Sequence, residues 1–404
     1  MDVDWEMATE SQKEQWRVRS QVFQIFNFFS ELPRSAQSLM LELHRDQHLE
    51  YLNNGLRQLG PSFVVLDASR PWLCYWILHS ISLFGDSVDS NIGQSVIEFL
   101  NCCQDSDGGY GGGPGQIPHL ATTYAAVSSL ITLGGDKAYS SINRTKLHQF
   151  LRRMKHVSGG FRMHDNGEID VRACYVAISV ASILNIMDDE LIKDVDEYIV
   201  SCQSYEGGIA GEPGCEAHGG YTYCGLATMV LIGKAHKLNM KRLIVRCLNW
   251  RVGLMWENLK QEWAVFRQGE ECGFQGRINK LVDGCYSFWQ GSVLHLTQFI
   301  GGEYSLNSES LFHPTALQQY ILLCSQVPDG GFRDKPGKPR DFYHTCYCLS
   351  GLSLCQHGPT RGQDSPPPPN AILGPCTNLL EPLHPLHNVT LKQYHLAIQY
   401  FIES

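Results

Sequence analysis

Apolar stretches of helical length recur along this chain, separated by glycine turns and polar connectors. Residues 14–57 are expected to be helical, because apolar positions such as Val22, Phe26 and Phe29 meet few breakers before Gly55. Each later unit then reads as an apolar helix, a glycine turn, a connector of about eight residues and a second apolar helix. The first helices are expected to end within 96–103, 147–154, 192–202 and 317–324. The repeating unit is therefore a helical hairpin.

Five glycine turns each precede a polar and an aromatic or apolar position at constant offsets. They are Gly108-Gly109, Gly159-Gly160, Gly207-Gly208, Cys272-Gly273 and Gly330-Gly331. Ten residues after the second glycine stand His119, Asp170, His218, Asp283 and Asp341, and fifteen after it stand Tyr124, Tyr175, Tyr223, Phe288 and Cys346. One hairpin cannot bury its apolar face alone, so neighbouring hairpins must stack. The pattern predicts an all-α fold, an α/α barrel (toroid) with second helices inside and connectors around one mouth.

One domain over residues 1–404 is expected, because the repeats run through most of the chain. Its parts are an N-terminal helical segment (1–57), the repeats (58–356), a proline-rich surface loop (357–390) and a closing helix (391–404). The third interval between turns is longer than its neighbours, which predicts an amphipathic extension of an outer helix within 253–268.

Composition narrows the class of protein. A net charge of −9 and a pI near 6.0 argue against nucleic acid as the main partner, because phosphate binding needs a basic surface. The 15 cysteines are an odd number, and no signal peptide precedes them. No apolar run approaches the length of a membrane span, so no transmembrane segment is expected. We therefore expect a cytoplasmic protein whose cysteines are mostly buried thiols.

Three residues of adjacent repeats offer a set of zinc ligands. Asp283 and Cys285 begin the fourth inner helix, and His344 lies thirteen residues after the fifth turn. An oxygen, a sulfur and a nitrogen ligand make three quarters of a tetrahedral zinc site, and an open fourth position implies a substrate ligand. A substrate thiol bound there would lose its proton but remain nucleophilic. The alternative is that Asp283 caps a helix, Cys285 is core and His344 is an interior histidine.

Cations and aromatic rings gather around the same connectors. Arg277 and Lys280 follow the fourth turn at the offsets at which Lys335 and Lys338 follow the fifth, which predicts a polyanion site, although a single loop cation is most often only solvated. Aromatic residues on the inner helices could line an apolar tunnel: Trp72, Trp76, Tyr175, Tyr221, Tyr223, Trp289 and Tyr347. A long apolar molecule with a diphosphate head fits such a tunnel.

Five longer motifs now resemble a known family. They are residues 66–76, 109–116, 216–221, 276–290 and 335–347, and they resemble the protein farnesyltransferase beta subunits of the CaaX prenyltransferase family, over about residues 40–356. The resemblance implies a heterodimer with an alpha subunit made of helical hairpins. It also implies transfer of farnesyl from farnesyl diphosphate to the cysteine of CaaX-terminated proteins such as small GTPases.

The resemblance assigns roles residue by residue. Zn²⁺, one per chain, would be held by Asp283, Cys285 and His344, and Mg²⁺ assisting the departure of diphosphate would be linked to Asp334. Tyr286 and Lys280 would act in catalysis, and they would hold the diphosphate together with His218 and Arg277. The isoprenoid would contact Arg172, Tyr175, Tyr221, Cys224 and Trp289. The CaaX peptide would contact Trp72, Trp76, Tyr343, Ala68, Ser69, His119 and Ala121.

Three other functions remain open from the residues. A geranylgeranyl-transferring beta subunit would share the site, but bulky Trp72 and Tyr347 favour the shorter donor. A terpene cyclase would need an acidic motif in place of the Asp, Cys and His set. A non-enzymatic helical toroid need hold no zinc. Two departures from the family pattern concern the site: Thr122 stands where proline is usual, and Cys272 replaces a turn glycine.

Overall fold

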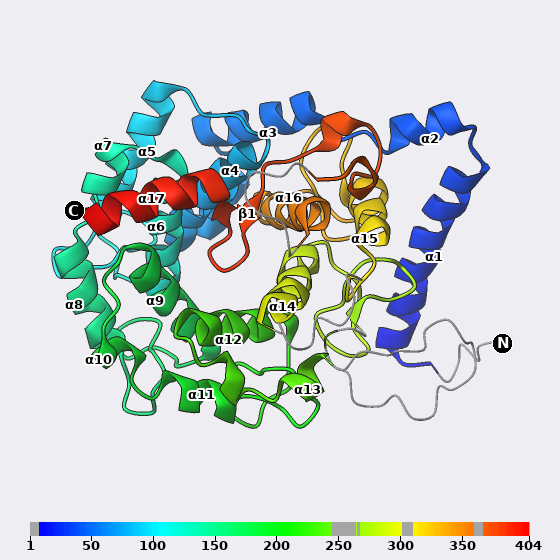
Figure 1. Cartoon of the computed structure of the whole chain (residues 1–404). Coiled ribbons are helices and arrows are strands. Elements are labelled where there is room, and N and C mark those ends of the chain that lie inside the picture. The colour runs from blue at the N-terminus through cyan, green and yellow to red at the C-terminus, as the bar shows by residue number, and fades with distance from the viewer. Residues whose placement is uncertain (1–7, 245–263, 265–266, 301–309, 359–366, 404) are drawn as a thin grey trace.

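The computed structural model describes residues 8–244, 264, 267–300, 310–358 and 367–403. Within these residues a ring of inner helices encloses the barrel axis, and each packs on the next (Figure 1). The last returns to the first, which closes the ring. Most residues of these helices are buried, as expected of helices that are apolar all round. In order they are α4 (Arg70–Leu83), α6 (Leu120–Leu133), α9 (Val171–Ile183), α12 (Gly219–Leu231), α14 (Tyr286–Ile300) and α16 (Phe342–His357).

A second layer of helices surrounds this ring and buries one face only. In α8 the buried residues are Leu147, Phe150, Leu151 and Met154, one stripe of an amphipathic helix. The outer helices are α3 (Arg45–Arg57), α5 (Ser90–Cys103), α8 (Arg144–Met154), α11 (Val195–Ser201), α13 (Met240–Ile244) and α15 (Pro314–Tyr320), which continues as the π-helical turn η4 (Ile321–Ser325). The α/α barrel expected from the repeats is confirmed.

One predicted outer helix is broken. A continuous helix is expected over residues 192–202, but α10 (Asp189–Ile192) ends before Lys193, and Asp194 adopts the left-handed conformation (φ 57°) ahead of α11. Shorter elements complete the repeats: η1 (Pro61–Ser69), α7 (Asp136–Ser140) and η2 (Ala235–Lys237). The extension predicted for 253–268 lies outside the described residues, except for Ala264, Arg267 and Gln268.

The glycine turns are required by backbone geometry. Gly108 has a φ of 95°, and a Cβ there would lie 2.0 Å from the carbonyl oxygen of Lys146 at the start of α8. Gly159 and Gly330 also have a positive φ and approach the backbone of another repeat equally closely. Cys272 keeps the left-handed conformation (φ 67°) without being glycine, which is an unfavourable backbone for a residue with a Cβ. The turn thus keeps its shape even where its first glycine is lost.

The N-terminal segment runs from the outer wall to the mouth of the barrel. It contains α1 (Glu10–Glu31) and α2 (Arg34–Met40) before α3. Helix α1 buries Val18 and Val22 and contacts η4. Its polar face reaches the fourth repeat, where Gln15 Nε2 donates to the carbonyl oxygen of Lys280 at 3.4 Å and Arg19 pairs with Glu270.

The prediction of a surface loop over 357–390 is wrong for its later part. Asn378, Leu380 and residues 387–390 are buried, and a hairpin of β1 (Leu383–His384) and β2 (Val389–Thr390) projects into the ring (Figure 1). We call residues 383–390 the C-terminal hairpin. Its polar groups form hydrogen bonds to the inner helices, which compensates for their burial. Composition alone cannot reveal these bonds. Two short turns, η5 (Pro369–Ala371) and η6 (Cys376–Asn378), precede it and α17 (Leu391–Glu403) follows.

Candidate active site at the mouth of the barrel

A layer of capping side chains surrounds the mouth. In four repeats the residue ten positions after the glycine turn is the N-cap of an inner helix, and its side chain accepts a hydrogen bond from a backbone N–H of the first turn. In the fourth repeat Asp283 lies three residues before the first residue of α14 and accepts the N–H of Cys285. The five acceptors are His119 (from Ala121, 3.0 Å), Asp170 (from Arg172, 2.7 Å), His218 (from Gly220, 3.1 Å), Asp283 (from Cys285, 2.8 Å) and Asp341 (from His344, 2.7 Å). The constant offset therefore marks helix starts, which all face the same mouth.

Asp283, Cys285 and His344 come together at this rim. One ligand atom from each lies within 4.8 Å of the other two, and no other group of three His, Cys, Asp or Glu side chains in the described parts of the chain has this arrangement. Ligand atoms of a tetrahedral zinc site are about 3.5 Å apart, so small side-chain movements would complete the set. His344 Nε2 is buried without a hydrogen bond to any described residue, and it lies 3.2 Å from Asp283 Oδ1. The three residues therefore fit a zinc ion.

The capping role and the metal role of Asp283 are compatible. Its Oδ1 accepts the N–H of Cys285 and also lies 3.2 Å from His344 Nε2, so the capping bond does not turn the carboxylate away from the other ligands. Gly284 between the two ligands is tightly packed, because a Cβ there would lie 2.6 Å from Cys348 Sγ and 3.1 Å from the carbonyl oxygen of Arg333. Its N–H donates to the carbonyl oxygen of Asp334 at 2.7 Å. This packing holds Asp283 and Cys285 in place against the fifth repeat.

Asp341 orients His344. Its Oδ1 accepts the N–H of His344, and its Oδ2 accepts a hydrogen bond from the ring Nδ1 at 2.7 Å. A proton on Nδ1 leaves Nε2 as the nitrogen that faces Asp283 and Cys285. Sequence reasoning missed this role, although the position was visible at the constant offset.

Burial and mutual contacts shift the pKa values of the three side chains. Burial lowers the pKa of His344, but the carboxylates of Asp283 and Asp341 outweigh it and raise that pKa to about 9. Burial and the neighbouring Asp283 raise the pKa of the Cys285 thiol well above its usual value. Burial raises the pKa of Asp283, yet the contact with the His344 imidazole leaves it lowered overall. Ligation by all three groups requires the deprotonated thiol and neutral imidazole, so metal binding would release protons.

Tyr286 and His218 form a hydrogen-bonded pair beside the triad. The Tyr286 hydroxyl lies 2.9 Å from His218 Nε2. His218 Nδ1 already accepts the N–H of Gly220, so the ring proton is on Nε2 and is donated to the tyrosine oxygen. Burial and the positive Arg277 lower the pKa of His218, which favours this neutral ring. The Tyr286 O–H is therefore free to donate to an anion at the mouth.

Arg277, Lys280 and Lys335 bring positive charge to the same side. Arg277 pairs with Glu216 at 2.9 Å, and Lys280 is exposed in a connector that turns at Asn279 (φ 57°). Lys335 is buried and pairs with Asp334, while Lys338 is exposed. The second oxygen of Asp334, Oδ1, is buried without a hydrogen bond to any residue that the structure describes. The connectors of the fourth and fifth repeats thus carry these cations, and Arg277 lies close enough to the Tyr286 and His218 pair to lower the pKa of both side chains relative to burial alone.

Aromatic rings extend from the triad into the barrel. Trp289 Nε1 donates to the Tyr343 hydroxyl at 3.2 Å, and its ring lies 4.4 Å from that of Tyr347. Trp76 and Tyr343 are 5.5 Å apart, and Trp72 stacks on Trp76 at 5.6 Å. These ring contacts cross from α14 through α16 to α4. The half-buried members of this set can contact a ligand in the barrel: Trp72, Trp76, Trp289 and Tyr343.

Comparison with known proteins places this arrangement in a family. Residues 43–389 match the prenyltransferase alpha-alpha toroid domain. The chain is similar to the protein farnesyltransferase subunit beta of Arabidopsis thaliana, with 52% identity over 98% of this chain and 90% of that protein. It is 51% identical to the same subunit of Pisum sativum, over 97% of this chain and 96% of that protein.

The chain belongs to the family of protein farnesyltransferase beta subunits. The resemblance read from its motifs is confirmed. The solved structure of Candida albicans protein geranylgeranyltransferase-I complexed with GGPP matches with a TM-score of 0.66 and 21% identity, over 90% of this chain and all of that one, which supports the fold. None of the described helices is both long and apolar enough to span a bilayer.

Four of the residues assigned to the peptide lie around the first connector, and the other three are the rings of Trp72, Trp76 and Tyr343. Ala68 and Ser69 end η1 and pack against the first connector, where Gly112 accepts the N–H of Arg70 at 3.0 Å. His119 and Ala121 begin α6 beside them. Thr122 turns its hydroxyl to the carbonyl oxygen of Tyr110 at 2.7 Å and is buried, so its departure from proline adds no free polar group to this rim.

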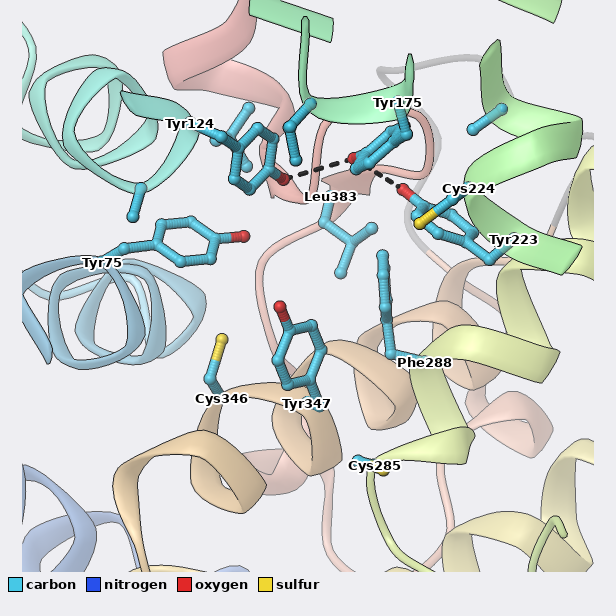
Figure 2. Packing of buried hydrophobic residues seen from close by; sticks show 14 of the residues in the cluster. Tyr75, Tyr124, Tyr175, Tyr223, Cys224, Cys285, Phe288, Cys346, Tyr347 and Leu383 are labelled. Carbon is cyan, nitrogen blue, oxygen red and sulfur yellow. Dashed lines mark hydrogen bonds between the residues drawn. The ribbon is translucent and has the colours of Figure 1, made fainter. Parts of the chain in front are cut away.

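The residues assigned to the isoprenoid occupy two depths. Arg172 and Tyr221 lie together near the mouth, with the guanidinium 5.5 Å from the ring centre and paired with Asp170. Tyr175 and Cys224 are deeper and buried. The Tyr175 hydroxyl contacts those of Tyr124 and Tyr223 and the C-terminal hairpin (Figure 2). No sequence signal linked that hairpin to the barrel interior.

Proposed function

We propose that this chain is the catalytic beta subunit of a protein farnesyltransferase, which moves farnesyl from farnesyl diphosphate to the cysteine thiol of CaaX-terminated proteins. The observation that carries the proposal is the convergence of Asp283, Cys285 and His344 beside the Tyr286 and His218 pair. The family of the chain supports the same reaction. The active form would be a heterodimer with a prenyltransferase alpha subunit.

Asp283, Cys285 and His344 would hold one zinc ion. When bound there, zinc would lower the pKa of the substrate thiol and keep it as a thiolate. Asp283 and the deprotonated Cys285 would supply two negative charges beside the substrate sulfur, which would keep that sulfur electron-rich and nucleophilic. Asp341 keeps His344 in the tautomer that this set needs.

The chain's own residues would stabilise the leaving group. The sulfur attacks C1 of farnesyl diphosphate, the S–C1 bond forms, the C1–O bond breaks, and its electron pair leaves with the diphosphate. Tyr286, with its oxygen occupied by His218, can donate its proton in a hydrogen bond to that developing charge. Arg277 and Lys280 would add positive charge there. Asp334, whose Oδ1 has no described partner, could hold a magnesium ion against the same diphosphate.

The aromatic rings would bind the farnesyl chain and exclude water. Trp72, Trp76 and Tyr343 would be shared between the isoprenoid side and the peptide side, because they bridge α4 and α16. Bulky Trp72 and Tyr347 favour a donor of three isoprene units over one of four. A geranylgeranyltransferase beta subunit would use the same site with the longer donor, and it is the second candidate.

Coexpression with an alpha subunit tests the proposal. The purified heterodimer should contain one zinc per beta chain and should transfer farnesyl to a CaaX peptide but not to the same peptide with serine in place of cysteine. Peptides that differ only in the last residue would define the preference near His119 and Ala121. A heterodimer that binds zinc but transfers only geranylgeranyl would favour the second candidate, and one without zinc or transfer would refute the proposal.

A further inference from the structure

The C-terminal hairpin is bound by an ordered set of tyrosine hydroxyls. Four successive carbonyl oxygens at its tip each accept one hydrogen bond from a tyrosine of the ring. The pairs are Tyr223 to Pro385 (2.8 Å), Tyr175 to Leu386 (3.0 Å), Tyr124 to His387 (2.9 Å) and Tyr75 to Asn388 (2.7 Å). These tyrosines belong to α12, α9, α6 and α4, which are neighbours in the ring. Four consecutive helices of the ring thus each donate one hydrogen bond to the tip of the hairpin.

The hairpin enters the barrel from the end opposite the mouth. At the C-terminal ends of the inner helices, the carbonyl oxygen of Leu83 accepts the N–H of Glu381 at 2.8 Å, and the hydroxyls of Ser82 and Thr390 are 2.9 Å apart. Farther in, Ser179 contacts His387 Nδ1 at 2.9 Å. The tip then reaches the tyrosine layer. Tyr124 follows its helix cap by five residues, about 7.5 Å of helix below the mouth.

The tyrosine layer therefore lies in the barrel interior between the metal triad at the mouth and the end through which the hairpin enters. Trp72 packs on the layer from the side, 6.0 Å from Tyr75 and 5.8 Å from Tyr124. Leu383 lies among the rings of this layer and is buried (Figure 2). An isoprenoid that enters from the mouth therefore meets the rings and the hairpin together.

The hydroxyls position the hairpin, whereas the rings would pack without them. The four carbonyls sit at the tip of a buried turn, where an unsatisfied acceptor is costly. Loss of a hydroxyl would leave its carbonyl without this donor and would favour withdrawal of the tip toward solvent. Withdrawal would open room for a ligand where the tip now lies, without removing any aromatic side chain.

We propose that the C-terminal hairpin, held at fixed depth by these tyrosine hydroxyls, is a further element, besides Trp72 and Tyr347, that limits the length of the isoprenoid that the barrel accepts. The inference rests on the proposed function. The tyrosines are positioning residues in this role, because they act through the hairpin. In this arrangement Trp72 limits the width of the barrel interior, and the hairpin limits its depth from the end opposite the mouth.

The test uses the heterodimer with an alpha subunit and two competing donors, farnesyl diphosphate and geranylgeranyl diphosphate. One variant carries Tyr124→Phe and Tyr175→Phe, which keep both rings, and a second carries Leu383→Ala. We expect each to raise the ratio of kcat/KM for the longer donor over the shorter by about tenfold or more. Equilibrium competition of the two donors against a fluorescent farnesyl diphosphate analogue should shift in the same direction without any transfer.

Two matched controls separate this role from general destabilisation. Tyr198→Phe removes another buried hydroxyl that donates to a backbone carbonyl, that of Ile169 at 3.1 Å, in an outer helix. Leu380→Ala shortens a buried leucine that precedes the hairpin. Both should lower the melting temperature and leave the donor ratio unchanged.

The outcomes are distinct. A wild-type heterodimer that transfers neither donor refutes the proposed function. An active wild type whose donor ratio is the same in both hairpin variants, while their melting temperatures fall, overturns the inference and leaves the proposed function standing. If the double tyrosine variant does not assemble, Leu383→Ala and the single Tyr175→Phe decide the question by the same ratio.

Discussion

Replacement of Asp341 by asparagine should weaken zinc binding without loosening the helix. In the structure one carboxylate oxygen of Asp341 caps α16 and the other accepts the Nδ1 proton of His344 at 2.7 Å. Asparagine is as good a cap as aspartate, so its oxygen should take the capping bond. Its NH₂ group would then face Nδ1 and favour the tautomer with the proton on Nε2, which is the nitrogen that must bind the metal.

The expected size of the effect comes from this geometry. Loss of an outer partner of a metal-bound histidine typically costs 10-fold to 100-fold in metal affinity, about 1.4–2.8 kcal/mol. The free energy of unfolding in the presence of a chelator should change by less than about 0.5 kcal/mol, because the cap remains. Asp341→Ala should lose the cap as well, at a further cost of about 1 kcal/mol.

Zinc affinity is measured by competition with a chromophoric chelator, and stability by thermal unfolding with excess chelator. Asp89→Asn is the matched control, because Asp89 caps α5 with a hydrogen bond from Asn91 at 2.9 Å and lies away from the triad. If Asp341→Asn bound zinc as tightly as the wild type, the argument from the tautomer of His344 would be refuted.

Four further outcomes are expected. Tyr286→Phe should lower kcat by about 100-fold with little change in zinc content, because it removes one donor to the leaving group; an unchanged single-turnover rate would exclude that role. Gly284→Ala should abolish zinc binding, since its Cβ would lie 2.6 Å from Cys348 Sγ, whereas Gly60→Ala, with open space around it, should not. Burial lowers the pKa of His48 to about 4, so between pH 6.5 and 4 this residue binds a proton in the unfolded chain but not in the folded chain. The free energy of unfolding should therefore decrease by up to about 3 kcal/mol as the pH is lowered through this range, and an equal slope in His48→Gln would contradict this. Arg19→Glu should raise the KM for the diphosphate donor by loosening the connector of Lys280, and Glu270→Arg in the same chain should restore it; failure of the exchange would show that the pair has no such effect.

The sequence predicted the barrel because its signal is repeated. The five turns report the same backbone requirement, seen in Gly108 and Gly159, and the apolar helices between them can be buried only by stacking. The triad was also within reach, because Asp283, Cys285 and His344 lie at repeat offsets that bring adjacent connectors to one rim. Because the repeats have a nearly constant length, the position of a residue within its repeat predicts where it lies in the ring.

Other parts could not be predicted because their reasons are not local. Residues 378–390 have the composition of a loop, and only their bonds to Tyr75, Tyr124 and other ring residues explain their burial. The constant offset was visible in the sequence, but its physical cause, helix capping, needed the backbone of each repeat. Capping and metal binding were alternatives for Asp283, and the structure places its carboxylate both as the acceptor of the Cys285 N–H and within reach of the ligand atoms of Cys285 and His344.

The layer of caps has a consequence for how such a mouth can diversify. Starting an inner helix requires only one acceptor at its first position, and histidine and aspartate meet that demand equally in His119, Asp170 and His218. Exchange among such residues costs the scaffold little, so each repeat can acquire a new chemical group independently of the others. Five sites of this kind face one opening, and a new reaction could arise there without redesign of the architecture beneath it.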